Sequence, residues 1–123
     1  MEQRSKHTVL IVDDSSLIIE RLIEALKDHE TVEKILTAKG YGETIEILNE
    51  KQADIILLDI QLAEKSGIDL LKIIVKDHPE TKVIMFSNLA SDYYMNLCKK
   101  LGAKYFLDKS KDFELIPGIL ASI

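Results

Sequence analysis

The chain has a single cysteine, Cys98, so it can form neither an internal disulfide framework nor a cysteine metal cluster. It has no long basic run and a net charge of -5, from 16 basic and 21 acidic residues, so its charge gives no support for direct nucleic-acid binding. No apolar stretch approaches the length of a membrane span. The first residues also lack the apolar segment of a secretory signal. These absences predict a soluble, cytoplasmic protein that binds neither nucleic acid nor a membrane.

The residues that are present suffice for one folded unit. Apolar residues make up 46% of the 123 positions, which argues against disorder. A chain of this length favours one domain, and it contains no repeats, low-complexity tracts or linkers. We therefore expect a single domain over residues 1–123.

Short apolar runs alternate with helical patterns along the whole chain. Runs of this length between helices are typical of buried parallel strands, which we predict at about residues 7–12, 34–38, 55–59, 82–87 and 104–107. Apolar positions at helical spacing predict helices at about 15–28, 42–51, 67–76, 91–101 and 112–123. Pro117 lies inside the last pattern, so we expect that helix to begin late or to bend near 114–118.

This alternation favours an α/β fold, with a parallel sheet covered by helices on both faces. Five strands suit the flavodoxin-like order 2-1-3-4-5, in which the first and third strands are neighbours. All strands of a parallel sheet end at the same edge. The residues that follow the strands are therefore expected to meet there.

Charged and polar residues stand at these strand ends. Asp13 and Asp14 follow the first strand, Asp59 follows the third, Ser87 ends the fourth and Lys109 follows the fifth. Three carboxylates close together repel one another unless a cation lies among them. Open α/β sheets also bind their ligands at this edge. The sequence therefore predicts a chemical site there.

These strand-end motifs resemble those of the receiver domains of two-component response regulators. The resemblance rests on Val-Asp-Asp-Ser at 12–15, Leu-Leu-Asp-Ile at 57–60 and Leu-Gly-Ala-Lys-Tyr-Phe-Leu-Asp-Lys at 101–109. No single piece is specific, but the pieces occur in the family's order and spacing. The resemblance implies a phosphoacceptor switch of His-Asp signalling, which catalyses only its own phosphorylation and dephosphorylation. We expect no output domain in this chain.

The resemblance implies that Asp59 accepts a phosphoryl group from a histidine kinase or a histidine phosphotransfer protein, with Mg²⁺ as cofactor. It implies that Asp14 and Asp59 bind the metal directly, Asp13 largely through water, and Gln61 through its backbone carbonyl. Residue chemistry agrees, because a carboxylate can form an acyl phosphate and Mg²⁺ needs only a few protein oxygens. Phosphoryl transfer depends mostly on positioning and charge neutralisation.

The family also implies a switch. Lys109 would contact one phosphoryl oxygen and Ser87 would donate a hydrogen bond to another, while Phe106 is the switch aromatic. Movement of Ser87 and rotation of Phe106 would change the face formed by the fourth helix, the fifth strand and the last helix. That face would bind a downstream protein, take part in passing the phosphoryl group onward in a relay, or form a phosphorylation-dependent homodimer. Its residues would include Asp92, Tyr93, Met95, Asn96, Lys99, Lys104 and Tyr105.

The chain departs from the family pattern at several positions. Ser110 stands where many receivers have proline after a cis bond, and we expect a trans bond because a cis bond before a non-proline residue costs about 2.5–4 kcal/mol. Ala63 replaces another common proline, which favours a more mobile loop over 61–66. Asn88 replaces a small residue beside the site. Leu89 cannot orient an attacking water by hydrogen bonding, so we predict slow intrinsic loss of phosphate.

Three other interpretations are less consistent with the residues. A pseudo-receiver usually lacks an acid or the lysine, and all are present here. A metal-dependent phosphatase of similar topology would have a second acid where this chain has Gln61. A flavin-binding protein would have a glycine- and hydroxyl-rich phosphate cradle after the first strand, where this chain has two acids. The start and compact end slightly favour a stand-alone receiver over a fragment of a larger regulator.

Overall fold

The fold is a five-stranded parallel sheet in the order β2-β1-β3-β4-β5. The computed structural model describes residues 6–123. The predicted domain and the predicted absence of a secretory signal also involve residues 1–5, which lie outside the described residues. The strands are β1 (His7–Val12), β2 (Val32–Ala38), β3 (Ile55–Leu58), β4 (Lys82–Ser87) and β5 (Tyr105–Asp108). The predicted flavodoxin-like α/β topology is confirmed.

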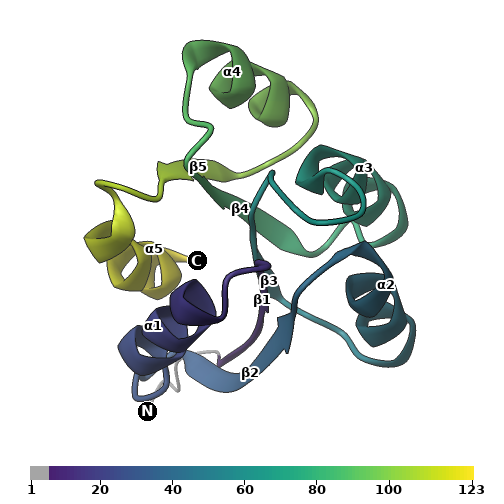
Figure 1. Cartoon of the computed structure of the whole chain (residues 1–123). Coiled ribbons are helices and arrows are strands. Elements are labelled where there is room, and N and C mark those ends of the chain that lie inside the picture. Colours follow the sequence, from purple (N-terminus) through teal and green to yellow (C-terminus); the bar gives the residue numbers. More distant parts are fainter. Residues whose placement is uncertain (1–5) are drawn as a thin grey trace.

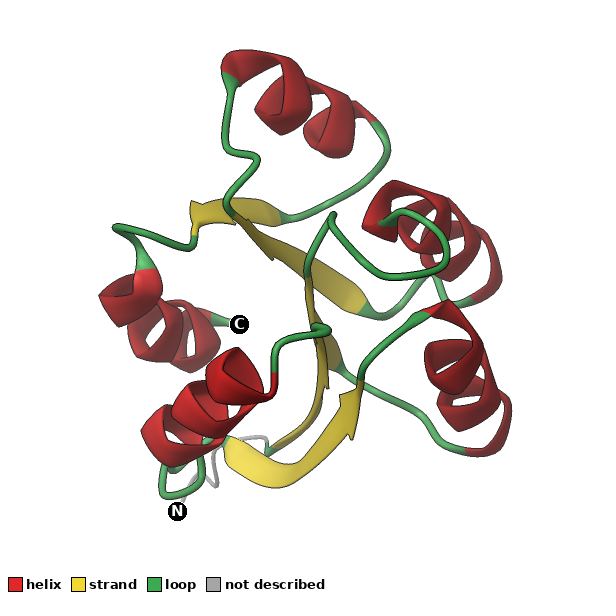
Figure 2. Cartoon of the chain, viewed as in Figure 1, coloured by secondary structure: helices red, strands yellow, loops and turns green. Residues whose placement is uncertain are grey.

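Helices cover both faces of the sheet (Figures 1 and 2). The helices are α1 (Ser16–Leu26), α2 (Tyr41–Glu50), α3 (Gly67–Asp77), α4 (Asp92–Lys100) and α5 (Ile116–Ser122), the last preceded by the 3₁₀ turn η1 (Phe113–Leu115). α1 and α5 lie on one face, and α2, α3 and α4 lie on the other. None of the helices within residues 6–123 is long and apolar enough to cross a membrane.

Alternate residues of each central strand enter different cores. In β1, Val9 and Ile11 pack with α1 and α5, whereas Leu10 and Val12 pack with the helices on the opposite face. All four side chains are buried. This two-sided burial explains why the strands are continuous apolar runs rather than alternating ones.

The starts of the helices follow from local chemistry. The hydroxyls of Ser15, Ser66 and Ser91 accept hydrogen bonds from first-turn backbone amides at 3.3, 3.0 and 3.4 Å, which caps α1, α3 and α4. α5 begins only at Ile116, with Pro117 in its first turn, where the missing amide breaks no helical hydrogen bond. The predicted late start of this helix is confirmed.

Candidate functional site

The carboxyl ends of β1 and β3 bring three acidic residues together. Val12 of β1 pairs with Leu58 of β3, so the two chains enter the site side by side. The backbone amide of Asp59 also donates to the carbonyl of Val12 at 3.1 Å. Asp13, Asp14 and Asp59 each offer a carboxylate oxygen, and these oxygens lie within 4.8 Å of one another.

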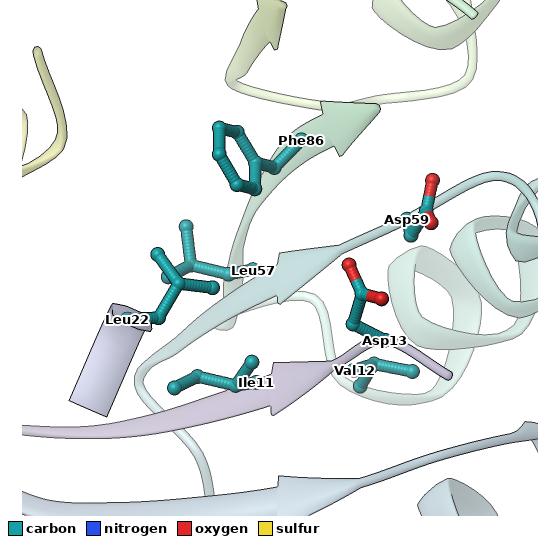
Figure 3. A pocket seen from close by; sticks show the side chains of 7 residues that line it. All are labelled: Ile11, Val12, Asp13, Leu22, Leu57, Asp59 and Phe86. Atoms are coloured by element: carbon teal, nitrogen blue, oxygen red, sulfur yellow. The ribbon is translucent and has the colours of Figure 1, made fainter. Parts of the chain in front are cut away.

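Two of the three acids are buried. Asp13 is 2% exposed and Asp59 is 3% exposed, while Asp14 is exposed. Figure 3 shows Asp13 and Asp59 just past the ends of neighbouring strands, with the apolar side chains of Leu57 and Phe86 further back along the strands. The space between these apolar side chains and the two aspartates leaves no room for a water molecule. Burial is the main reason that the pKa of Asp13 is raised above its ordinary value.

Lys109 links the two buried acids. Its Nζ atom lies 2.7 Å from Oδ2 of Asp13 and 2.7 Å from Oδ2 of Asp59, and its side chain is 9% exposed. Burial by itself would lower the pKa of Lys109, but its hydrogen bonds to the two carboxylates and their negative charges outweigh this, so the pKa is raised. The ammonium therefore stays charged and partly neutralises the acid cluster.

Backbone amides orient the same two carboxylates. Oδ1 of Asp13 accepts a hydrogen bond from the amide of Ser15 at 2.9 Å, and Oδ1 of Asp59 accepts one from the amide of Gln61 at 3.3 Å. Each buried carboxylate thus uses one oxygen for an amide and the other for Lys109. These paired contacts hold both groups in defined orientations.

The cluster suits a hard divalent cation. Asp13, Asp14 and Asp59 carry three negative charges and Lys109 one positive charge, which leaves two negative charges for a divalent ion to neutralise. Mg²⁺ prefers oxygen ligands at about 2.0–2.1 Å, so opposite ligands lie about 4.2 Å apart. The 4.8 Å spread of the carboxylate oxygens is close to this span. The donor set therefore fits Mg²⁺, and the carbonyl of Gln61 as a further ligand stays a prediction.

Gly67 supports Asp59 from behind. A β-carbon on Gly67 would lie 1.8 Å from the carbonyl oxygen of Asp59, far inside any tolerated contact. The amide of Gly67 also donates to the carbonyl of Ile60 at 2.7 Å. The first turn of α3 therefore packs directly on the Asp59 backbone. This role of Gly67 was not predicted from the sequence; the available signal was a glycine at the first position of the helix that follows Asp59.

Ser87 and Phe106 lie on the neighbouring strands β4 and β5, with Ser87 at the carboxyl end of β4 and Phe106 two residues before the end of β5. Ser87 is fully buried, its hydroxyl accepts a hydrogen bond from the amide of Leu89 at 3.1 Å, and its carbonyl accepts one from the amide of Lys109 at 3.1 Å. Phe106 pairs with Met85 and lines a pocket of about 290 Å³ between α4 and β5. Ser87 thus contacts the backbone of Lys109, and Phe106 faces the α4 side.

Other predictions concern the rest of the chain. Residues 6–123 contain no cis peptide bond, so the bond between Lys109 and Ser110 is trans as predicted. Cys98 is buried in the core, and burial raises the pKa of its thiol, which agrees with an inert thiol. In the 61–66 loop, the ammonium of Lys65 lies 4.6 Å from the ring centre of Tyr41, and the predicted mobility of this loop stays a prediction.

Comparison with known families defines the class of this protein. The family described as "Response regulator receiver domain" matches residues 9–120. The chain belongs to this family, as its strand-end motifs predicted. The family is one of signalling phosphoacceptors.

Individual relatives agree with this assignment. The chain is similar to the transcriptional regulatory protein LnrK of Bacillus subtilis, with 28% identity over 108 residues, which are 88% of this chain and 49% of that protein. It is 33% identical over 107 residues to a protein-glutamate methylesterase/protein-glutamine glutaminase of Methanococcus maripaludis, which are 85% of this chain and 29% of that protein. The chain thus spans half or less of the length of these curated relatives.

A solved structure shows the same fold. The response regulator domain of Thermotoga maritima CheB is 28% identical to this chain and superposes with a TM-score of 0.82. The match covers 97% of this chain and 92% of that one. The similarity therefore extends over the whole sheet and its helices.

Proposed function

We propose that this chain is the phosphoacceptor switch of a His-Asp signalling system, that it acts in the cytoplasm and that Asp59 is the phosphoacceptor. One observation carries the proposal: the buried carboxylate of Asp59 lies 2.7 Å from the ammonium of Lys109 and within a three-acid cluster that fits Mg²⁺. The donor would be a histidine kinase or a histidine phosphotransfer protein. The domain itself would bind neither nucleic acid nor a membrane.

In the proposed reaction, an oxygen of Asp59 attacks the phosphorus of a phosphohistidine. The new oxygen–phosphorus bond forms as the phosphorus–nitrogen bond breaks, and the electron pair leaves with the imidazole nitrogen, which then takes up a proton. Mg²⁺ would be held by Asp14 and Asp59 directly, by Asp13 through water and by the carbonyl of Gln61. Bound there, it would supply charge neutralisation for the phosphoryl oxygens.

Lys109 supplies the second positive charge. An ammonium group has three N–H donors, and Asp13 and Asp59 accept from two of them. When the phosphoryl group arrives, the third N–H can donate to a phosphoryl oxygen while Asp13 and Asp59 still accept from the other two. The positive charge of Lys109 thus lies beside the charge that is transferred throughout the reaction.

Ser87 and Phe106 would carry the signal away from the site. The hydroxyl of Ser87 accepts a hydrogen bond from Leu89 and still has its own proton to donate to a phosphoryl oxygen. Its movement would draw the end of β4 inward and let Phe106 leave the α4 side. The face formed by α4, β5 and α5 then changes for a downstream protein, for relay or for a phosphorylation-dependent homodimer.

Intact mass spectrometry tests the proposal. The wild type and Asp59→Asn are incubated with a small acyl phosphate or with phosphoramidate, which has the phosphorus–nitrogen bond of phosphohistidine, each with and without Mg²⁺. We expect one Mg²⁺-dependent phosphoryl adduct in the wild type and none in the variant. An adduct that persists in Asp59→Asn, or no wild-type adduct from either donor, would contradict the proposed function.

A further inference from the structure

A compact turn follows β5 and is organised around Asp108. Oδ1 of Asp108 accepts two hydrogen bonds from Ser110, one from its backbone amide at 2.8 Å and one from its hydroxyl at 2.6 Å. The amide of Asp108 donates to Oδ2 of Asp112 at 2.9 Å. Its carbonyl accepts from the amides of Lys111 and Asp112 at 3.2 and 2.8 Å. The side chain and both backbone polar groups of Asp108 are therefore all used within this turn.

Lys109 lies inside the same turn. Its backbone amide donates to the carbonyl of Ser87 at 3.1 Å, which holds one side of Lys109 against β4. The hydrogen bonds between Asp108 and Ser110 join the residues immediately before and after Lys109. From this backbone position the ammonium reaches Asp13 and Asp59. The direction of the Lys109 side chain thus depends on the turn as well as on the sheet.

Serine at position 110 makes this arrangement possible. A proline there would fix its own φ angle but would have no N–H to donate. Ser110 keeps the amide and adds a hydroxyl, and Asp108 accepts from both. Aspartate side chains that bind the backbone two residues onward stabilise turns of this kind. The Asp108–Ser110 contacts therefore hold the turn in a chain that lacks the proline.

We propose that Asp108, acting through Ser110, is a positioning residue that fixes the backbone of Lys109 so that its ammonium meets Asp59 and the incoming phosphoryl group. The part that concerns phosphoryl transfer rests on the proposed function. The part that concerns the placement of the ammonium does not. A displacement of about 1 Å can cost on the order of 10²-fold in rate, so transfer is expected to suffer more than stability.

The first test compares Asp108→Ala, Asp108→Asn and Asp54→Ala. Asp54 is a matched control, because its carboxylate also accepts a backbone amide, that of Thr8 at 2.7 Å, but it precedes β3 at the opposite edge of the sheet. The rate of phosphorylation by a small acyl phosphate is measured at saturating Mg²⁺. We expect Asp108→Ala to be slower by roughly 5- to 20-fold, and Asp108→Asn, which keeps the oxygen acceptor, and Asp54→Ala to remain within about 2-fold of the wild type.

The second test observes the ammonium of Lys109 directly by ¹⁵N NMR, in metal-free and unphosphorylated protein. Held by two buried carboxylates, this group is expected to exchange slowly and to give a resolved signal. The signal is expected to broaden or disappear in Asp108→Ala and to remain in Asp54→Ala. Ser110→Ala keeps the backbone amide hydrogen bond to Asp108 but loses the hydroxyl hydrogen bond, so it is expected to give an intermediate loss of the Lys109 signal. This variant provides the test if Asp108→Ala does not fold.

These outcomes separate the two proposals. If the wild type accepts no phosphoryl group, the proposed function fails, while the ammonium signal still decides the role of Asp108. A wild-type Lys109 signal in both Asp108→Ala and Ser110→Ala overturns the positioning role. The same holds if Asp54→Ala slows transfer as much as Asp108→Ala, because the effect would then be one of general stability.

Discussion

Lys109 and Asp13 form a buried ion pair, with Nζ of the lysine 2.7 Å from Oδ2 of the aspartate. Their side chains are only 9% and 2% exposed, so water screens the pair weakly. Asp59 shares the same ammonium at the same distance. The protonation of Asp13 and the protonation of Lys109 therefore depend on each other and on the negative charge of Asp59.

We predict that Asp13 titrates above its ordinary pKa of 3.8 in the metal-free protein, because burial outweighs its hydrogen bonds to Lys109 and Ser15. Lys109→Met should raise this pKa further, because it removes a positive charge that lowers it. Asp59→Asn should lower this pKa, because it removes a negative charge that raises it. Carboxyl ¹³C shifts measured against pH check both directions.

The sign of the effect on stability follows from linkage. The native state binds the Asp13 proton more tightly than the unfolded state, so ionised Asp13 destabilises the fold at neutral pH. This destabilisation decreases as the pH falls from the native pKa toward 3.8. Below pH 3.8 it is absent, and Asp13 no longer makes the stability depend on pH. A native Asp13 pKa below 3.8, or equal shifts in the two variants, would contradict this account.

Mg²⁺ should stabilise the fold through the acid cluster. At a Mg²⁺ concentration of one hundred times Kd, binding would add about 2.7 kcal/mol to the free energy of unfolding. Asp14→Ala should abolish most of this gain with little change in the metal-free protein, because Asp14 is exposed. Thermal unfolding with and without Mg²⁺ at constant ionic strength measures the difference. Glu46→Gln, at an exposed acid of α2, is the control, and an unchanged Mg²⁺ response in Asp14→Ala would argue against the site.

Gly67→Ala should destabilise the protein and disturb Asp59. The new methyl group would lie 1.8 Å from the Asp59 carbonyl oxygen, so backbone must move, at a cost of about 1–3 kcal/mol or more. Gly42→Ala is the matched control in α2, because a β-carbon there meets nothing within 4 Å. We expect it to be neutral or stabilising by up to about 1 kcal/mol. Urea unfolding compares the two, and equal stabilities would refute the close-packing argument.

Leu89→Glu should shorten the lifetime of the phosphoryl group. A carboxylate at this position can orient an attacking water, so we expect hydrolysis to accelerate by roughly tenfold, short of the roughly 10²–10⁴-fold of full general-base catalysis. The side chain of Leu89 also packs against the core, so Leu89→Met, which keeps its volume and polarity, is the control. Decay of the adduct is followed by intact mass after removal of the donor. If hydrolysis is no faster in Leu89→Glu than in the wild type, then Leu89 is not the cause of slow intrinsic hydrolysis.

Phe106→Ala should uncouple the site from the α4–β5 surface. Phosphorylation of the wild type is expected to change hydrogen exchange in α4 and β5, and the variant should be phosphorylated without this change. Tyr93→Ala provides a control on the same surface, since Tyr93 is 68% exposed on α4 and belongs to the face that responds rather than to the proposed Ser87–Phe106 link. An exchange response in Phe106→Ala equal to that of the wild type would show that the coupling does not run through this ring.

Much of the fold could be predicted because its signals are local. The apolar runs around Val9 and Ile55 are buried on both faces, and helix starts such as Ser15 carry their own caps. Parallel strands end at one edge, so the meeting of Asp13 with Asp59 followed from strand order alone. The small differences lie at element ends; β2, for example, begins at Val32 rather than near residue 34.

The sequence by itself determined which residue types stand at the strand ends, because the alternation of strands and helices and the order of the sheet are encoded in patterns along the chain. Only the tertiary structure decided that Asp13 is buried while its neighbour Asp14 is exposed, and that Lys109 bridges Asp13 and Asp59. It also decided that Gly67 must lack a side chain. These features depend on distances between segments far apart in the chain, and local sequence patterns carry no information about such distances.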